Sequence, residues 1–183
     1  MASKRKRTES LTDLAAVLYE QGKYAEAGQL YREALEGRRR ELGDAHPHTL
    51  MVINNLAISL KRLGKYAEAE PLYREALEGR RRELGDAHRD TLASINNLAI
   101  SLKRLGKYAE AEKLYREALD GSRRVLGDAH PLTLMVINNL ASLLRKQAEI
   151  KLAEAERLTG KEQLDDTAVN ALMLLAKEGA SSL

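Results

Sequence analysis

Three short motifs recur along this chain at one fixed spacing of 42 residues. The motif Gly-Lys-Tyr-Ala-Glu-Ala begins at Gly22, Gly64 and Gly106. The two others are Asn-Asn-Leu-Ala, which begins at Asn54, Asn96 and Asn138, and Gly-Asp-Ala-His, which begins at Gly43, Gly85 and Gly127. A constant period of this length is typical of arrays in which each unit buries its apolar face against its neighbours. We therefore expect stacked repeats rather than one globular core.

Each repeat carries the apolar spacing of two helices. Leucine and alanine residues within 11–18 follow the i, i+3, i+4, i+7 spacing of one helix face, and Gly22 is expected to end that helix. A second apolar stripe runs over residues 24–42. Gly43 then suits a helix end and Pro47 suits the start of the next helix. The pattern predicts an all-α fold, a right-handed α-solenoid of tandem antiparallel helix hairpins.

The period also sets the predicted boundaries. The expected segments are a basic N-terminal tail (1–7), three repeats (8–46, 47–88 and 89–130), a divergent fourth repeat (131–160), a C-terminal capping helix (161–178) and a short tail (179–183). The cap is predicted from an apolar stripe at Val169, Leu172, Leu175 and Ala176.

The fourth repeat departs from the pattern at its turn. It has Gln147-Ala148-Glu149-Ile150 where the third has Leu105-Gly106-Lys107-Tyr108, so the glycine turn signal is lost. Either residues 131–158 form one unbroken helix or a weaker turn lies near residues 146–149. The likeness of residues 153–156 to residues 109–112 favours the turn.

Two kinds of internal residue test the helix prediction. Pro71 falls inside a predicted second helix, where it removes one backbone hydrogen bond and is expected to bend the segment. Gly37, Gly79 and Gly121 also fall inside second helices, at a cost of about 1 kcal/mol each relative to alanine. They mark either points of close packing or places where the helix loosens. The arginine runs 38–40 and 80–82 are interpreted as solvated convex faces, with docking patches as the alternative.

Composition excludes several classes of protein. The chain has no cysteine, which removes disulfides and thiolate metal sites, and its net charge is only +3. No apolar run approaches the roughly 20 residues that a membrane span needs. With no secretory signal after Met1, we expect a cytoplasmic protein, or a nuclear one through the basic cluster Lys4–Arg7. We expect no membrane binding, and nucleic-acid binding is disfavoured.

No pattern of catalytic or metal-binding residues stands out. The recurring pairs such as Asp44 with His46 supply only two candidate ligands each, and neighbouring loops lie about one repeat apart, so helix capping explains them better than a metal. Carboxylates and histidines are not concentrated in any shared apolar segment. We therefore expect no enzyme activity, no metal and no cofactor.

The repeat resembles a known family. Residues 64–77, the Asn-Asn-Leu-Ala motif and the stretch Leu42–Leu50 are similar to tetratricopeptide repeats of the 42-residue kind, found in kinesin light chains and nephrocystin-like proteins. The resemblance covers about residues 10–160. It implies an interaction scaffold in which asparagines on the first helix of each repeat hold the backbone of an extended peptide, and basic residues meet its acidic side chains.

The helical period can be used to place those groups. At about 100° per residue, one stripe of each first helix carries the paired asparagines and a following cation, while the opposite stripe, including Leu98 and Leu102, must be core. The predicted peptide-binding groove consists of Met51, Asn54, Asn55, Ile58, Lys61, Arg62, Asn96, Asn97, Ile100, Lys103, Arg104, Asn138, Asn139 and Arg145. The first repeat has Thr12, Asp13, Ala16, Tyr19 and Glu20 instead, so we expect a neutral to acidic N-terminal end.

These observations favour a non-enzymatic scaffold for protein interaction, with an extended, acidic peptide as partner. Repeated asparagines could instead hydrogen-bond the neighbouring repeat and hold the stack in register. A second hypothesis is a self-associating array, a natural fragment or an engineered consensus, whose ends stack head to tail or exchange helices to form a homo-oligomer.

Overall fold

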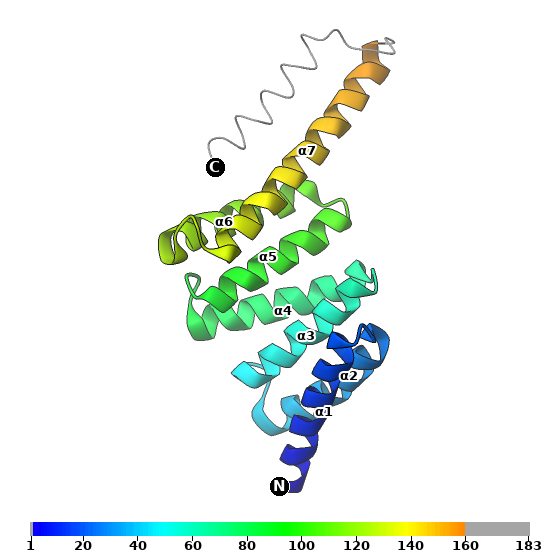
Figure 1. Ribbon diagram of the computed structural model, residues 1–183, viewed down its shortest axis with the longest axis vertical. Helices are drawn as coiled ribbons and strands as arrows, with labels where there is room; N and C mark the ends of the chain where they lie inside the picture. The colour runs from blue at the N-terminus through cyan, green and yellow to red at the C-terminus, as the bar shows by residue number, and fades with distance from the viewer. Residues whose placement is uncertain (1, 160–183) are drawn as a thin grey trace. The chain divides into compact units, whose positions relative to one another are not determined.

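The structure is a computed structural model that describes residues 2–159 (Figure 1). This part of the chain is helical and contains no strand. Its helices are α1 (Ala2–Glu20), α2 (Tyr24–Leu42), α3 (Pro47–Arg62), α4 (Tyr66–Leu84), α5 (Arg89–Arg104), α6 (Tyr108–Leu126) and α7 (Pro131–Thr159). They belong to two compact units, one ending at Lys107 with α1–α5 and the other beginning at Tyr108 with α6 and α7. The expected cap (161–178) and tail (179–183) lie outside the described residues.

Each hairpin turns at a glycine for a local reason. Gly64 has φ +74°, in the left-handed region that other residues rarely adopt. The Lys65 N–H donates to the Leu60 carbonyl at 2.9 Å and the Gly64 N–H to the Lys61 carbonyl at 3.0 Å, the two bonds of a Schellman helix end. The same bonds recur at Gly22 and Gly106. The predicted turns at these glycines are therefore confirmed.

The Gly-Asp-Ala-His motif builds the link from one repeat to the next. Asp44 lies 3.0 Å from the Arg39 guanidinium, at the end of α2. His46 caps α3 through Nδ1, which accepts the His48 N–H at 3.2 Å, and the Thr49 hydroxyl donates to the carbonyl of the preceding glycine at 2.8 Å. The third copy repeats the ion pair, the cap and the hydroxyl bond at Asp128, His130 and Thr133.

This geometry confirms helix capping as the role of the recurring histidines. Each aspartate is engaged by an arginine five residues earlier, and each histidine by the helix that follows. Within residues 2–159, no group of three or more metal-ligating side chains comes together.

In the first unit, α1, α3 and α5 form one layer and α2 and α4 the other (Figure 1). The core lies between the layers, where α3 contributes Leu50, Ile53, Ala57 and Leu60 and α4 contributes Ala69, Tyr73, Ala76 and Leu77, all buried. Leu98 and Leu102 of α5 are 2% and 0% exposed, so the predicted core stripe is confirmed. Burying a leucine fully contributes about 1.5 to 3 kcal/mol.

Two of the internal glycines are points of close packing. A Cβ atom at Gly79 would lie 2.4 Å from Leu50 Cδ2, and one at Gly37 would lie 2.2 Å from Thr8 Cγ2. In both hairpins the second helix therefore approaches the first through a residue without a side chain. Pro71 is accommodated in the same helix as Gly79, since α4 is continuous from Tyr66 to Leu84.

The two ends of the array differ from expectation. Helix α1 begins at Ala2, so the basic residues expected to form a tail before residue 8 are helical, and Arg7 pairs with Glu33 at 2.7 Å. The favoured turn near residues 146–149 is absent, because α7 is one helix from Pro131 to Thr159. Glutamine, alanine and glutamate are good helix formers, and Lys146 bonds Glu149 at 3.2 Å across the expected turn.

Candidate functional site

The predicted groove residues of the first unit lie on α3 and α5. Met51 is 37% exposed, and the two arginines, Arg62 and Arg104, are also exposed. The remaining accessible members are half-buried, and they are Asn55, Ile58, Lys61, Asn97, Ile100 and Lys103. We call these nine residues the α3–α5 face. In the second unit, α7 carries Asn138 and Arg145, which are exposed, and Asn139, which is half-buried.

The first asparagine of each pair is not part of this face. Asn54 is 8% exposed and Asn96 only 1%, so the expectation that both asparagines of a pair are exposed is wrong for the second and third repeats. Their positions border the core stripe rather than lying opposite to it. The Asn54 Oδ1 atom is buried, and none of the residues in 2–159 forms a hydrogen bond with it.

In the second and third repeats, the second asparagine of the pair contacts the preceding repeat. Asn97 Oδ1 accepts a hydrogen bond from Lys61 Nζ at 3.0 Å, which joins α5 to α3. Asn55 forms a hydrogen bond with the Tyr31 hydroxyl of α2. Burial raises the pKa of Tyr31, and this hydrogen bond partly opposes the rise. Both contacts are of the inter-repeat kind that the sequence left as an alternative role.

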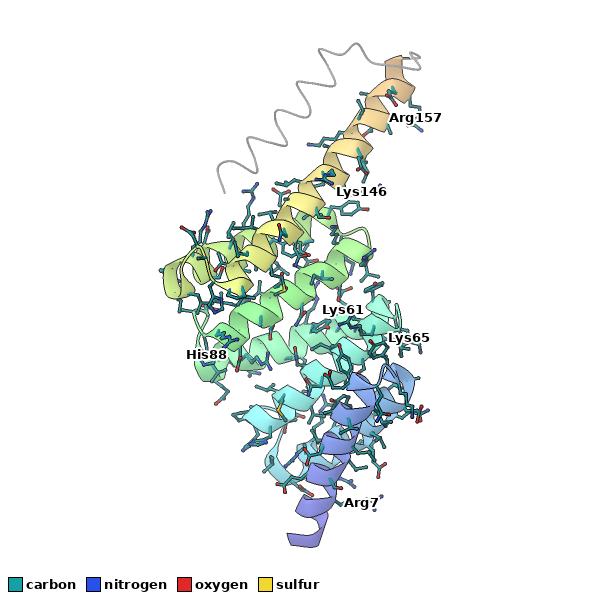
Figure 2. The ribbon with its side chains drawn as sticks, viewed as in Figure 1. Arg7, Lys61, Lys65, His88, Lys146 and Arg157 are labelled. Carbon is teal, nitrogen blue, oxygen red and sulfur yellow. The ribbon has the colours of Figure 1, made fainter. Side chains whose placement is uncertain are left out.

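Lys61 has an uncommon environment for a lysine (Figure 2). Its ammonium donates to Asn97 and lies 5.9 Å from the centroid of the Tyr73 ring. Burial, and then the neighbouring Arg62 charge, lower the pKa of Lys61 to about 8. Within the described residues, no carboxylate lies at ion-pair distance from it. The hydrogen-bond and cation–π partners of the Lys61 ammonium, Asn97 and Tyr73, are therefore neutral groups.

The next repeat places a similar lysine on α5. Burial, followed by the Arg104 charge, lowers the pKa of Lys103. Lys61 and Lys103 occupy the same repeat position, each followed by an arginine. The α3–α5 face thus carries two Lys-Arg pairs whose members repel each other.

Aromatic residues of the first repeat border the face. Arg62 Nε donates to the Tyr19 hydroxyl at 3.0 Å, and the guanidinium lies 6.0 Å from the Tyr19 ring and 5.9 Å from the Tyr24 ring. The hydrogen bond to Tyr19 is the main reason that the pKa of Arg62 is raised. Tyr19 stands where later repeats have Lys61 and Lys103, which is the signal in the sequence that the first repeat differs.

A pocket of about 230 Å³ opens between α1 and α3 beside these tyrosines. Its lining residues are Ala16, Tyr19, Glu20, Tyr31, Asn55 and Ile58. Glu20 supplies the one carboxylate among them. Sequence reasoning missed Tyr31, because a residue of the second helix reaches this side only through the packing of α2 against α3.

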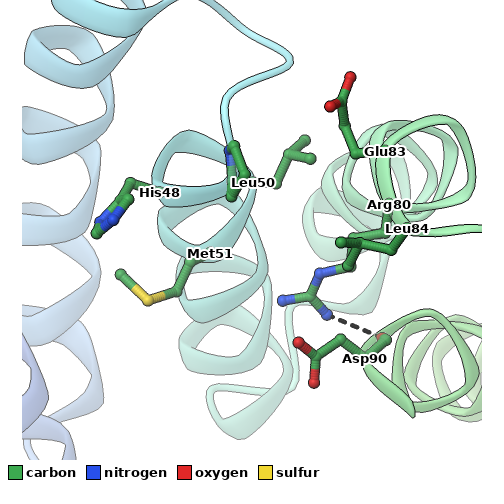
Figure 3. A pocket seen from close by; sticks show the side chains of 8 residues that line it. His48, Leu50, Met51, Arg80, Glu83, Leu84 and Asp90 are labelled. Atoms are coloured by element: carbon green, nitrogen blue, oxygen red, sulfur yellow. Dashed lines mark hydrogen bonds between the residues drawn. The ribbon is translucent and has the colours of Figure 1, made fainter. Parts of the chain in front are cut away.

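A second pocket, of about 220 Å³, lies where α3, α4 and α5 meet (Figure 3). Its apolar wall includes Leu50, Met51 and Leu84. Arg80 reaches across it from α4, and its Nη1 donates to the Asp90 carbonyl at 3.1 Å and to the Ser94 hydroxyl at 2.7 Å. The interpretation of residues 80–82 as a solvated face is therefore wrong for Arg80, which is half-buried and links α4 to α5.

Comparison with known protein families supports the repeat pattern. A family model described as Tetratricopeptide repeat matches residues 7–82, 51–123 and 90–156. No curated protein matches the chain. Within the described part of the chain, no helix is both long and apolar enough to span a bilayer.

Several solved structures share the fold. BtubC from P. vanneervenii is 21% identical with a TM-score of 0.69 over 96% of this chain, which spans 63% of that protein. A putative kinesin light chain from P. anserina with nearly identical TPR-like repeats is 22% identical with a TM-score of 0.70, over 96% of this chain and 87% of that one. The first TPR of Spaghetti, bound to the HSP90 peptide SRMEEVD, is 20% identical with a TM-score of 0.59. The match covers 78% of this chain and 94% of that one.

Proposed function

The chain belongs to the tetratricopeptide repeat family, whose arrays are scaffolds for protein interaction, and we propose that it binds an extended acidic segment along the α3–α5 face. The observation that carries the proposal is the environment of Lys61. Its ammonium is half-buried among an amide, an aromatic ring and another cation. A partly desolvated charge without a counter-ion is unfavourable, and an incoming carboxylate would compensate it.

The remaining groups of the face suit an extended peptide. Arg62 and Arg104 are exposed next to the two lysines, so acidic side chains can meet cations on both helices. Asn97 accepts from Lys61 through Oδ1 and keeps its amide N–H₂ as a donor for a peptide carbonyl. Ile58 and Ile100 supply apolar contact between the polar groups. Stacked first helices present such groups side by side along an extended binding surface.

The proposal is tested by peptide binding to the full chain. Acidic, neutral and basic peptides of equal length are compared by fluorescence anisotropy, with Lys61→Met plus Lys103→Met as the variant. We expect the acidic peptide to bind best and the double variant to lose about tenfold or more, since each charge-assisted hydrogen bond contributes about 1.5 to 3 kcal/mol. Lys113→Met, an exposed lysine of the second helix α6, is the matched control.

Two results would contradict the proposal. One is equal binding of the acidic and basic peptides. The other is a loss of affinity that is the same in the double variant and in the Lys113→Met control.

A specific observation also favours self-association as a second function. Leu14 and Val17 of α1 are 51% and 52% exposed, although the equivalent residues Leu56 and Ser59 of α3 are 3% and 0% exposed. In α3 this side packs on α2, so in α1 the corresponding side is open. Sedimentation over a range of concentrations, with Leu14→Gln as the variant, tests whether another copy covers it. A monomer at every concentration would exclude this function.

A further inference from the structure

Two equivalent asparagines of the α3–α5 face have different partners. Asn55 forms a hydrogen bond with the Tyr31 hydroxyl of the preceding second helix, α2. One repeat later, Asn97 lies at the position equivalent to Asn55, and Tyr73 of α4 lies at the position equivalent to Tyr31. Asn97 instead accepts a hydrogen bond from Lys61 Nζ at 3.0 Å. The same two repeat positions therefore use their polar groups differently in successive copies.

The Tyr73 hydroxyl is buried without a partner. Tyr73 is 0% exposed, and none of the residues in 2–159 forms a hydrogen bond with its hydroxyl. Burial raises the pKa of Tyr73, so the hydroxyl keeps its proton and can donate as well as accept. A buried hydroxyl that has lost its contacts with water and gained no hydrogen bond is unfavourable. A hydrogen bond to Tyr73 would therefore stabilise the state in which it forms.

A lysine accounts for the difference between the copies. In the first repeat, Tyr19 occupies the position that Lys61 occupies in the second. The Tyr19 hydroxyl accepts a hydrogen bond from Arg62 Nε at 3.0 Å, and the amide of Asn55 bonds Tyr31. The hydrogen bond between tyrosine and asparagine is thus present in the copy that has no lysine at this position.

In the later copy, Lys61 contacts both groups. Its ammonium lies 3.0 Å from Asn97 Oδ1 and 5.9 Å from the centroid of the Tyr73 ring. A hydrogen bond from a charged donor is stronger than one from a neutral hydroxyl, so Asn97 bonds Lys61 in preference to Tyr73. Lys61 is also the charged member of the three, and therefore the one that a carboxylate would attract.

We propose that Tyr73 is a positioning residue of the α3–α5 face, which bonds Asn97 when an acidic ligand draws Lys61 away from it. The ligand carboxylate then pairs with the ammonium, and Asn97 Oδ1 accepts the hydrogen bond of the Tyr73 hydroxyl. The buried hydroxyl gains the kind of partner that Tyr31 already has, which adds to the affinity for the ligand. The acidic ligand in this inference rests on the proposed function, but the exchange between Lys61 and Tyr73 can be measured without it.

Urea denaturation of four full-length chains measures the exchange: the unsubstituted chain, Tyr73→Phe, Lys61→Met and the double variant. Lys61→Met removes the competing donor, so Tyr73 is expected to bond Asn97. Tyr73→Phe should then leave the unfolding midpoint unchanged or raise it in the unsubstituted chain, and lower it in the Lys61→Met chain. A tyrosine that only fills space would shift both midpoints in the same direction.

Tyr31→Phe is the matched control for the unfolding experiment. Tyr31 has its asparagine partner whether or not Lys61 is present. Its substitution should therefore lower the midpoint in both the unsubstituted and the Lys61→Met chains, without a reversal of sign.

Fluorescence anisotropy with the acidic peptide measures the consequence for binding. In the unsubstituted chain, Tyr73→Phe should weaken binding by about two- to tenfold, the range that one neutral hydrogen bond contributes. In the Lys61→Met chain, Tyr73→Phe should leave the affinity unchanged, because the bond to Asn97 is present before the peptide arrives.

Two outcomes would overturn the inference. One is a shift of the unfolding midpoint by Tyr73→Phe in the same direction with and without Lys61. The other is an acidic peptide that binds the unsubstituted chain and the Tyr73→Phe variant equally well. If no acidic peptide binds the unsubstituted chain, the proposed function fails. A reversal of sign in the midpoints would then still support the exchange, and its absence would overturn the exchange as well.

Discussion

At the scale of single residues, Lys61 shows how burial lowers the pKa of a charged side chain. Its pKa of about 8 lies below the ordinary value for lysine because burial disfavours the charged form. Between about pH 8 and the ordinary lysine pKa, the unfolded chain therefore binds more protons than the folded chain at this site. The Lys61 contribution to stability consequently rises with pH across that window.

Binding of an acidic peptide should have the opposite dependence on pH. In the proposed function the peptide pairs with the charged form of Lys61, and burial lowers the pKa of this lysine to about 8 in the free protein. We expect affinity to fall as the pH is raised from 7 to 9, by up to about tenfold per pH unit above the pKa. Fluorescence anisotropy over this range measures it, and Lys61→Met should flatten the profile. An unchanged slope in that variant would contradict the role of Lys61.

Arg38 gives a second prediction at this scale. It is 3% exposed, and among the described residues its Nε has no hydrogen-bond partner, while its Nη1 lies 3.9 Å from the Glu9 carboxylate. A buried charge that is poorly paired often costs more than an apolar residue of similar size. We expect Arg38→Met to raise the free energy of unfolding by about 1 to 4 kcal/mol, measured by urea denaturation.

Arg80, at the same position of the next repeat, is the control for Arg38. Its guanidinium bonds the Asp90 carbonyl and the Ser94 hydroxyl. Arg80→Met should therefore lower the free energy of unfolding by about 1 to 3 kcal/mol. If both substitutions changed stability in the same direction, the pairing of the guanidinium would not be the deciding factor.

At the scale of helices, the glycines within α2 and α4 should respond in opposite ways to alanine. A Cβ at Gly28 would lie 3.9 Å from Ser59 Cβ, an ordinary contact, so Gly28→Ala should stabilise by about 1 kcal/mol through helix propensity. A Cβ at Gly79 would overlap Leu50, which is buried, and overpacking costs about 1 to 3 kcal/mol. We expect Gly79→Ala to be net destabilising. Urea denaturation measures both, and equal stabilisation would contradict the close packing.

Pro71 allows a reciprocal exchange between the same two helices. It lies within α4, is exposed, and occupies the position of Gln29 in α2. Proline inside a helix costs about 3 kcal/mol. Pro71→Gln should therefore raise the free energy of unfolding, and Gln29→Pro should lower it by a similar amount. A much smaller effect of Pro71→Gln than of Gln29→Pro would show that α4 has adapted to its proline.

At the scale of the whole array, the place of a repeat decides what the same residue contributes. Leu14 and Leu98 occupy equivalent positions, but they are 51% and 2% exposed. Leu98→Ala should cost about 2 to 5 kcal/mol, the usual range for a buried leucine. Leu14→Ala should cost less than about 1 kcal/mol, within the range of surface substitutions. Equal losses in urea denaturation would mean that Leu14 is covered in solution, as self-association requires.

Much of the fold followed from local chemistry. The glycine turns and the histidine caps depend on residues within one or two turns of each other, so the period of 42 residues was enough to place them. The core stripe of α5 followed from helical spacing in the same way. The continuity of α7 could not be predicted in this way. The loss of one glycine removes a turn signal, but it does not show whether a helix or another kind of turn takes its place.

The candidate face was predictable only in outline. Helical spacing selected the stripe that carries Lys61 and Asn97, but it could not separate Asn54 and Asn96, which are buried, from their exposed neighbours. It also could not identify Tyr31 or Arg80, since both belong to second helices and reach their pockets through tertiary packing.

The sequence by itself determined the repeat, its helices and its turns, because each depends on propensities and hydrogen bonds that act over a few residues. Within the described residues, the tertiary structure decided which polar groups lose water, which lysine has no carboxylate at ion-pair distance, and which side of α1 is exposed. Those properties depend on the helix that packs on each surface, and identical repeat positions have different neighbours at the ends and in the middle of the array.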